Sequence, residues 1–195
     1  FFYPEFKKFI SSEKVHDDDE NPSEFEEKRK NGENDSYICQ LIRHDSIEDF
    51  VRQVTKTNLS FSSLVPNSLF ETNSYLLKNR PSLIEYAAFF GSIQVFKYLN
   101  LSGAKISSSL WFYVIHGRNP EIIHLLEEIN FEKPKENYFE CIVESIKCHH
   151  IEFTEYIQNN LFENKGDKDG PLFSNCLKFY NFIYLKTSAK INTFS

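Results

Sequence analysis

Residues 81–104 constrain the fold of this chain more than any other part of the sequence. They begin with a short apolar stretch that contains the small residues Ala87 and Ala88, and Gly91 follows as a turn residue able to adopt positive φ. A second stretch, ended by Gly103, places its apolar residues mainly on one helix face: Ile93, Val95, Phe96 and Leu99. Two such short helices cannot bury their facing surfaces alone. The pattern therefore predicts stacking on similar neighbouring units.

The same pattern recurs at residues 108–128 and 138–161. Glu121 lies 27 residues after Gln94, and Glu152 lies 31 residues after Glu121, with similar apolar residues following each one. We therefore expect two further helix pairs, at an irregular spacing.

Weaker copies of the pattern lie at residues 36–56 and 171–185. In the first, Asp45 and Ser46 take the place of the glycine turn, and the expected apolar stripes are Tyr37, Ile38, Leu41, Ile42, Ile47, Phe50, Val51 and Val54. In the second, the expected apolar residues are Cys176, Leu177, Phe179, Phe182, Ile183 and Leu185.

Several residues at 107–120 carry local predictions. Asn119 followed by Pro120 is typical of a helix start, an N-cap with proline in the first turn. The serine run at 107–109 is expected to cap the helix that follows it. Trp111 is expected to be buried. His116, just after an apolar pair, is interpreted as a structural histidine rather than a ligand.

Residues 81–104 resemble the ankyrin repeat, a unit of about 33 residues. Leu83 and Glu85 depart from this pattern, because they stand where the repeat has proline and histidine. The positions that match are Ser82, Ile84, Ala87, Ala88, Gly91, Val95, Leu99, Gly103 and Ala104.

The sequence words LIEYAAFFGSIQVFKYL (83–99) and SLWFYVIHGRNPEIIHLLEE (109–128) resemble, more narrowly, a divergent ankyrin-like domain family of unknown function that is expanded in parasitic protists. The resemblance extends over about 36–185. It implies an all-α, ankyrin-like solenoid of stacked antiparallel helix pairs with irregular loops. It also implies protein binding, and it supplies no catalytic residues.

The remaining segments complete the expected organisation. Residues 1–34 are interpreted as the end of an upstream unit, an acidic loop and a polar helix, 35–185 as the repeats, and 186–195 as a truncated tail. The connection at 57–80 is expected to form an extended finger between units. Part of it is expected to fold back through Leu69, Phe70, Tyr75, Leu76 and Leu77. The chain contains no Met and begins with Phe1, so we expect it to be a fragment of a longer product.

The charge and hydropathy pattern disfavours several classes of partner. A net charge of −6 argues against general binding to nucleic acid or to an anionic membrane. No segment reaches the ~20 apolar residues of a membrane-spanning helix, and the first residues do not resemble a signal peptide. We therefore expect a cytoplasmic chain that neither inserts in membranes nor binds nucleic acid.

The cysteines and histidines suggest no strong chemical motif. The four cysteines are scattered, which favours buried free thiols. One group has mixed metal-ligand residue types, but it lacks the close Cys-x-x-Cys or His-x-x-x-His pair typical of zinc sites: Cys141, Cys148, His149 and His150. No catalytic, cofactor-binding or metal-binding residue is predicted, and no cofactor is expected.

Three hypotheses on function follow. The first is a non-enzymatic module that binds a partner protein through first-helix residues and inter-repeat fingers. The second is a thiol- or metal-dependent enzyme that uses Cys141, Cys148 and His150, and stoichiometric zinc or a hyper-reactive thiol would favour it. The third is a structural spacer, for which deletion of the 57–80 connection would leave every interaction unchanged.

Overall fold

The computed structural model describes residues 22–129, 138–161 and 169–184, and within them regular secondary structure is almost entirely helical. One isolated antiparallel bridge, Leu64 to Ser82, is the sole β-type pairing in these ranges. The all-α prediction is therefore confirmed for the described part. The helices are α2 (Pro22–Asn31), α3 (Tyr37–Arg43), α4 (Ile47–Thr57), α5 (Ser74–Asn79), α6 (Leu83–Phe90), α7 (Ile93–Leu101), α8 (Leu110–Gly117), α9 (Pro120–Glu128), α10 (Tyr138–Lys147), α11 (Ile151–Tyr156), the π-helical turn η2 (Ile157–Leu161) and α12 (Asp169–Lys178).

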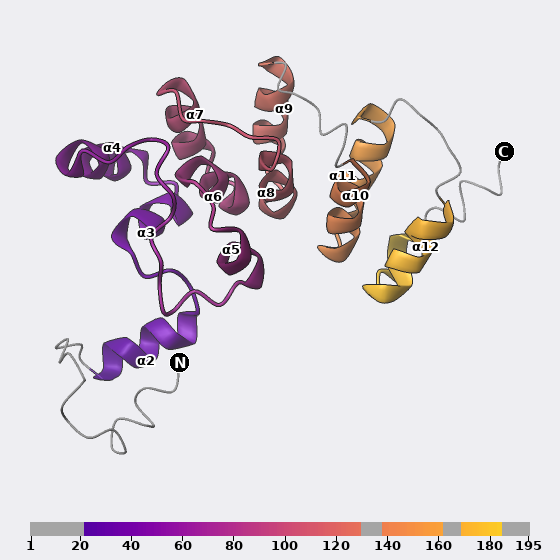
Figure 1. Ribbon diagram of the computed structural model, residues 1–195, viewed down its shortest axis with the longest axis horizontal. Helices are drawn as coiled ribbons and strands as arrows, with labels where there is room; N and C mark the ends of the chain where they lie inside the picture. Colours follow the sequence, from indigo (N-terminus) through magenta and orange to yellow (C-terminus); the bar gives the residue numbers. More distant parts are fainter. Residues whose placement is uncertain (1–21, 130–137, 162–168, 185–195) are drawn as a thin grey trace.

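The helices are arranged in pairs that follow one another in chain order (Figure 1). We call α3 and α4 unit A, α6 and α7 unit B, α8 and α9 unit C, α10 with α11 and η2 unit D, and α12 with residues 179–184 unit E. The first helices contact in the order α3, α6, α8, α10, α12, and the second helices contact in the order α4, α7, α9. The buried core is built from apolar residues of both the first and the second helices.

Each unit turns at a residue in the left-handed backbone region. The φ values are 50° at Asp45, 69° at Gly91, 53° at Arg118, 59° at His149 and 57° at Tyr180. As predicted, Asp45 takes in unit A the turn position that Gly91 has in unit B, because both residues have positive φ. In the other three units a bulky residue adopts the same conformation at a cost of roughly 1 kcal/mol, which the surrounding packing must offset.

The residue after each left-handed position ties its unit to the preceding one. In units B to E its side chain donates a hydrogen bond to a main-chain carbonyl near the end of the preceding first helix. These bonds are Ser92 Oγ to Ile42 O (2.6 Å), Asn119 Nδ2 to Gly91 O (2.8 Å), His150 Nδ1 to Ile115 O (2.8 Å) and Asn181 Nδ2 to Ile146 O (2.9 Å). The junctions therefore share one recurring contact.

Capping of the second helix differs between junctions. The Ser92 hydroxyl donates to Ile42 O of unit A and does not cap α7. The Asp45 carboxylate caps α7 instead, because it accepts hydrogen bonds from Gln94 N (3.0 Å) and Val95 N (2.9 Å). Gly91 has no side chain to serve the next helix in this way. Asn119 therefore performs both tasks, because its Oδ1 also accepts from Glu121 N at 2.9 Å.

The segment between units A and B folds back partly as expected. Phe70 and Leu76 are buried, whereas Leu69 is 80% exposed and Leu77 53% exposed, so burial of these two leucines is wrong as a prediction. Leu69 lies in the loop before α5, and Leu77 lies on the exposed side of α5, a helix of six residues that is too short to bury two faces. Phe70 also packs edge-to-face on Phe25 of α2 at 5.2 Å.

The remaining burial predictions have mixed outcomes. Trp111 is buried at 2% exposure, as expected. Four residues predicted to be apolar contacts are exposed instead: Tyr37, Leu177, Phe182 and Ile183. In unit E the buried residues after the turn are Asn181 and Tyr184, because the Asn181 side chain must reach the carbonyl of Ile146.

The serine run before α8 does not cap that helix. Ser109 makes no capping hydrogen bond, and the hydroxyls of Ser107 and Ser109 instead donate to Glu85 Oε1 at 3.3 and 2.5 Å. The second carboxylate oxygen of Glu85 accepts from Ser82 N at 2.8 Å in a capping box at the start of α6. Glu85, a departure from the ankyrin pattern, thus joins units B and C.

Some sequence predictions lie outside the described residues. They concern the apolar start and acidic loop at 1–21, Leu185 and the tail at 186–195. The polar helix expected after the acidic loop is α2, and Gly32 follows it with φ of 66°. Among the described residues, none of the helices combines the length and apolar character needed to cross a bilayer.

Candidate metal centre

The residues of the predicted metal-like group are not brought together. Cys141, in α10, faces the protein core and is 1% exposed. His150 Nδ1 donates a hydrogen bond to Ile115 O. Cys148 alone joins a cluster of possible ligands, with two residues that the sequence analysis did not select for this purpose, His116 and Glu144. The hypothesis that groups Cys141, Cys148 and His150 therefore has no geometric support.

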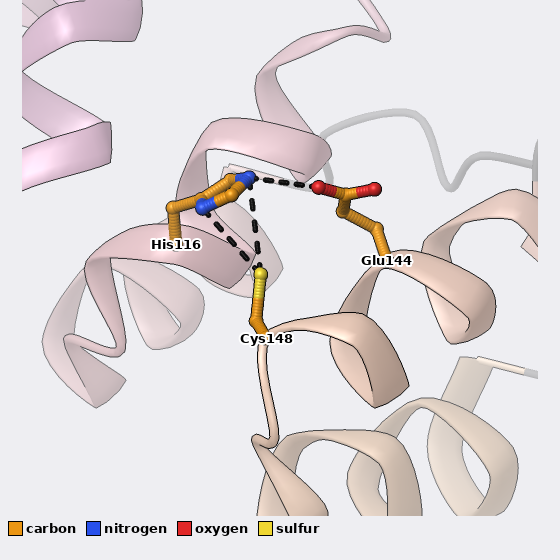
Figure 2. A group of neighbouring side chains, drawn as sticks. All are labelled: His116, Glu144 and Cys148. Atoms are coloured by element: carbon orange, nitrogen blue, oxygen red, sulfur yellow. Dashed lines mark hydrogen bonds and ion pairs between the residues drawn. The ribbon is translucent and has the colours of Figure 1, made fainter. Parts of the chain in front are cut away.

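The cluster lies at the junction of units C and D (Figure 2). His116 is in the last turn of α8, Glu144 is in α10, and Cys148 follows α10 immediately. His116 Nε2 is 3.0 Å from Glu144 Oε1 and 3.9 Å from Cys148 Sγ, while Nδ1 is 3.5 Å from Sγ. One donor atom of each residue lies within 4.8 Å of the other two.

Neighbouring groups hold these side chains in place. The His116 ring contacts two aromatic rings, Phe89 of α6, stacked at 4.7 Å, and Tyr75 of α5, tilted at 4.7 Å, and these two rings also stack on each other at 6.2 Å. Lys147 Nζ donates to both oxygens of Glu144, at 2.9 and 3.2 Å. The side chains of His116 and Glu144 are only 16% and 13% exposed. The cluster is thus preorganised and largely shielded from water.

Burial and hydrogen bonding determine the protonation states. Burial raises the pKa of the Cys148 thiol to about 11, and the Glu144 carboxylate adds to this effect while Lys147 opposes it. For Glu144, burial acts to raise the pKa, but hydrogen bonds from His116 and Lys147 outweigh it and the pKa is below its ordinary value. At neutral pH the cluster therefore holds a carboxylate and a protonated thiol.

Two kinds of chemistry use such a set of residues. The order thiol, imidazole, carboxylate has the connectivity of a catalytic triad. A nucleophilic cysteine requires a lowered pKa, however, and with a pKa of about 11 roughly one Cys148 thiol in ten thousand is ionised at pH 7. A bound cation removes this obstacle, because it displaces the thiol proton itself. The donor set is therefore better suited to a metal than to nucleophilic catalysis.

The four cysteines are free, and Cys39, Cys141 and Cys176 are buried. Burial raises the pKa of each of these three thiols, with smaller contributions from neighbouring groups at Cys39 and Cys141. The prediction of buried free thiols is confirmed for these three, and Cys148 is half-buried.

A signal for the cluster was present in the repeat register. Glu144 and Cys148 are four residues apart, which places them on one helix face. Units C and D are offset by 31 residues, so the position in unit D that is equivalent to His116 is Lys147. Lys147 lies between Glu144 and Cys148 in the sequence. Because equivalent positions of stacked units face each other, His116 is expected opposite that face.

Comparisons of the chain with models of protein families, with curated proteins and with solved structures found no match.

Proposed function

We propose that this chain is a non-enzymatic protein-interaction module built as a divergent ankyrin-like solenoid. The observation that carries the proposal is the recurring junction, in which one position of units B to E donates a hydrogen bond to a carbonyl of the unit before it. A stack held by such nearest-neighbour contacts grows in one direction and offers an extended surface, which repeat proteins use to bind partners.

The segment between units A and B supports the proposal and suggests where a partner binds. It carries three half- or fully exposed leucines, Leu64, Leu69 and Leu77, at 54%, 80% and 53% exposure. We propose these three side chains as the contact surface. The net charge of −6 favours a protein over a nucleic acid as the partner.

The same proposal places the module in the cytoplasm. Four free thiols and no disulfide among them are typical of a reducing compartment. Burial of three of the thiols reduces their reactivity further.

Affinity capture with the purified chain tests the proposal. The bait is the purified 195-residue chain, and the partners are captured from an extract of the source cell. The test variant carries both Leu69→Asp and Leu77→Asp. The control variant is Phe173→Asp on α12, a residue whose exposure is similar to that of Leu77. We expect one specific protein partner that is lost with the leucine variant and kept with the control. No specific partner, together with turnover of a small molecule, would reject the module in favour of an enzyme.

A further inference from the structure

We propose that His116 Nε2, Glu144 Oε1 and the Cys148 thiolate bind one Zn²⁺ ion at the junction of units C and D, with water as the fourth ligand. The proposal concerns a site of its own and does not depend on what the module binds. It assigns ligands from two different units to the same ion.

The distances between the donor atoms fit a tetrahedral ion. Zinc bonds of about 2.0–2.1 Å to nitrogen and oxygen and about 2.3 Å to sulfur place neighbouring tetrahedral ligands roughly 3.3–3.6 Å apart. The distance from Nε2 to Oε1 is 3.0 Å and that from Nε2 to Sγ is 3.9 Å. Shifts of a few tenths of an ångström suffice for these two distances, and the third pair, Oε1 and Sγ, lies within 4.8 Å. Figure 2 shows contacts from Nε2 to both the carboxylate and the sulfur, and a second contact from Nδ1 to the sulfur.

The donor types favour zinc over harder cations. Thiolate and imidazole select zinc or other borderline metals, whereas calcium and magnesium require mainly oxygen ligands. One thiolate and one carboxylate also balance the two charges of Zn²⁺, as a largely shielded site requires. On binding, the Cys148 thiol releases its proton to solvent, and the proton that His116 Nε2 donates to Glu144 moves through solvent to Nδ1, which leaves Nε2 free for the ion.

Outer contacts already orient the ligands. Phe89 and Tyr75 fix the plane of the His116 ring. Lys147 gives up its 2.9 Å bond to Glu144 Oε1 when that oxygen binds the ion, and it keeps its 3.2 Å bond to Oε2. Loss of such outer contacts commonly lowers metal affinity 10-fold to 100-fold. The ion would connect α8 to α10 and so strengthen the junction between units C and D.

Titration of the purified chain with Co²⁺ and Zn²⁺ tests the site. We expect saturation at one equivalent, a thiolate-to-cobalt charge-transfer band, the visible d–d bands of a tetrahedral ion, and bleaching of both by one equivalent of Zn²⁺. The spectrum should disappear in Cys148→Ser, and metal affinity should fall at least about tenfold in Glu144→Gln and His116→Gln. Circular dichroism identifies any variant that fails to fold.

The control variants separate this set from the one suggested by the sequence. Cys141→Ala and His150→Asn should keep the full cobalt spectrum, because neither residue belongs to the cluster. X-ray absorption at the zinc edge of the unmodified chain should show one sulfur and three nitrogen or oxygen ligands, and it needs no variant. No binding at one equivalent, two or more sulfur ligands, or a spectrum that depends on Cys141 or His150 would overturn the proposal.

Discussion

Gly117 illustrates how a single residue sets the distance between two units. It is helical and needs no unusual φ, but a Cβ atom there would overlap the main-chain carbonyl oxygen of Ala88 in α6. Gly91 is confined less severely, since its Cβ would lie 2.9 Å from Gly117 O. The two glycines let units B and C approach through their main chains.

We therefore expect Gly117→Ala to destabilise the chain by about 3 kcal/mol, at the upper end of overpacking effects, because the backbone must move to accommodate the methyl group. The control is Gly103→Ala, where a Cβ meets nothing within 4 Å and the positive φ of 80° alone costs about 1 kcal/mol. Chemical denaturation of both variants measures the difference. A Gly117 variant as stable as the Gly103 variant would contradict the close approach.

Asp45 acts as a helix cap across a junction. Replacement by glycine keeps the left-handed turn but removes both acceptors for Gln94 N and Val95 N. We expect Asp45→Gly to lower the free energy of unfolding by about 1 kcal/mol. Asp45→Asn keeps one acceptor oxygen and should lose less. If denaturation curves show glycine to be neutral, the cap contributes nothing to the junction.

At the scale of helices and turns, the junction between units C and D differs from the others because it uses a histidine. Burial lowers the pKa of His150 below its ordinary 6.5, the hydrogen bond to Ile115 O opposes this shift, and the charges of Arg118, His116 and His149 add to it. A pKa that is lower in the folded chain gives stability that is complete above pH 6.5 and is lost as the pH falls.

The variant His150→Asn tests this pH dependence. Asn119 and Asn181 occupy the equivalent position and donate from Nδ2, so asparagine should preserve the bond to the carbonyl. We expect the variant to equal the original chain at pH 8 and to lose less stability on acidification below pH 6.5. Denaturation at a series of pH values measures it, and identical pH profiles would contradict the role of His150.

Sequence reasoning predicted the elements better than their connections. Apolar periodicity and the turns at Gly91 and Asn119 sufficed for helix pairs, because these signals are local. The left-handed conformation of Arg118, His149 and Tyr180 is not predictable from these residues, because arginine and tyrosine have no local preference for it and the preference of histidine is too weak to decide it.

The candidate site shows the same division between local and long-range information. Cys148 was noticed through its neighbours in sequence, but its partners His116 and Glu144 are brought to it by the packing of α8 on α10. Proximity along the chain led instead to Cys141 and His150, which face the core and a carbonyl. Reading equivalent positions across units would have found the cluster.

At the scale of the whole molecule, the proposed solenoid predicts local responses to truncation. In the described part, α12 packs on α10. We expect a chain that ends at residue 161 to lose hydrogen-exchange protection in α10 and α11 while α3, α6 and α7 keep theirs. Uniform loss of protection across all helices would indicate one cooperative globule and contradict the solenoid.

The unequal division of capping between Asp45, Ser92 and Asn119 has a consequence for modularity. If a copy of unit B were inserted after unit B, the residue before it at the position of Asp45 would be Gly91, which has no carboxylate. The second helix of the copy would then have no side-chain cap at its start. Neighbouring units are thus matched pairs rather than interchangeable parts. Duplication or recombination in such a gene must carry both sides of a junction to yield a chain that folds.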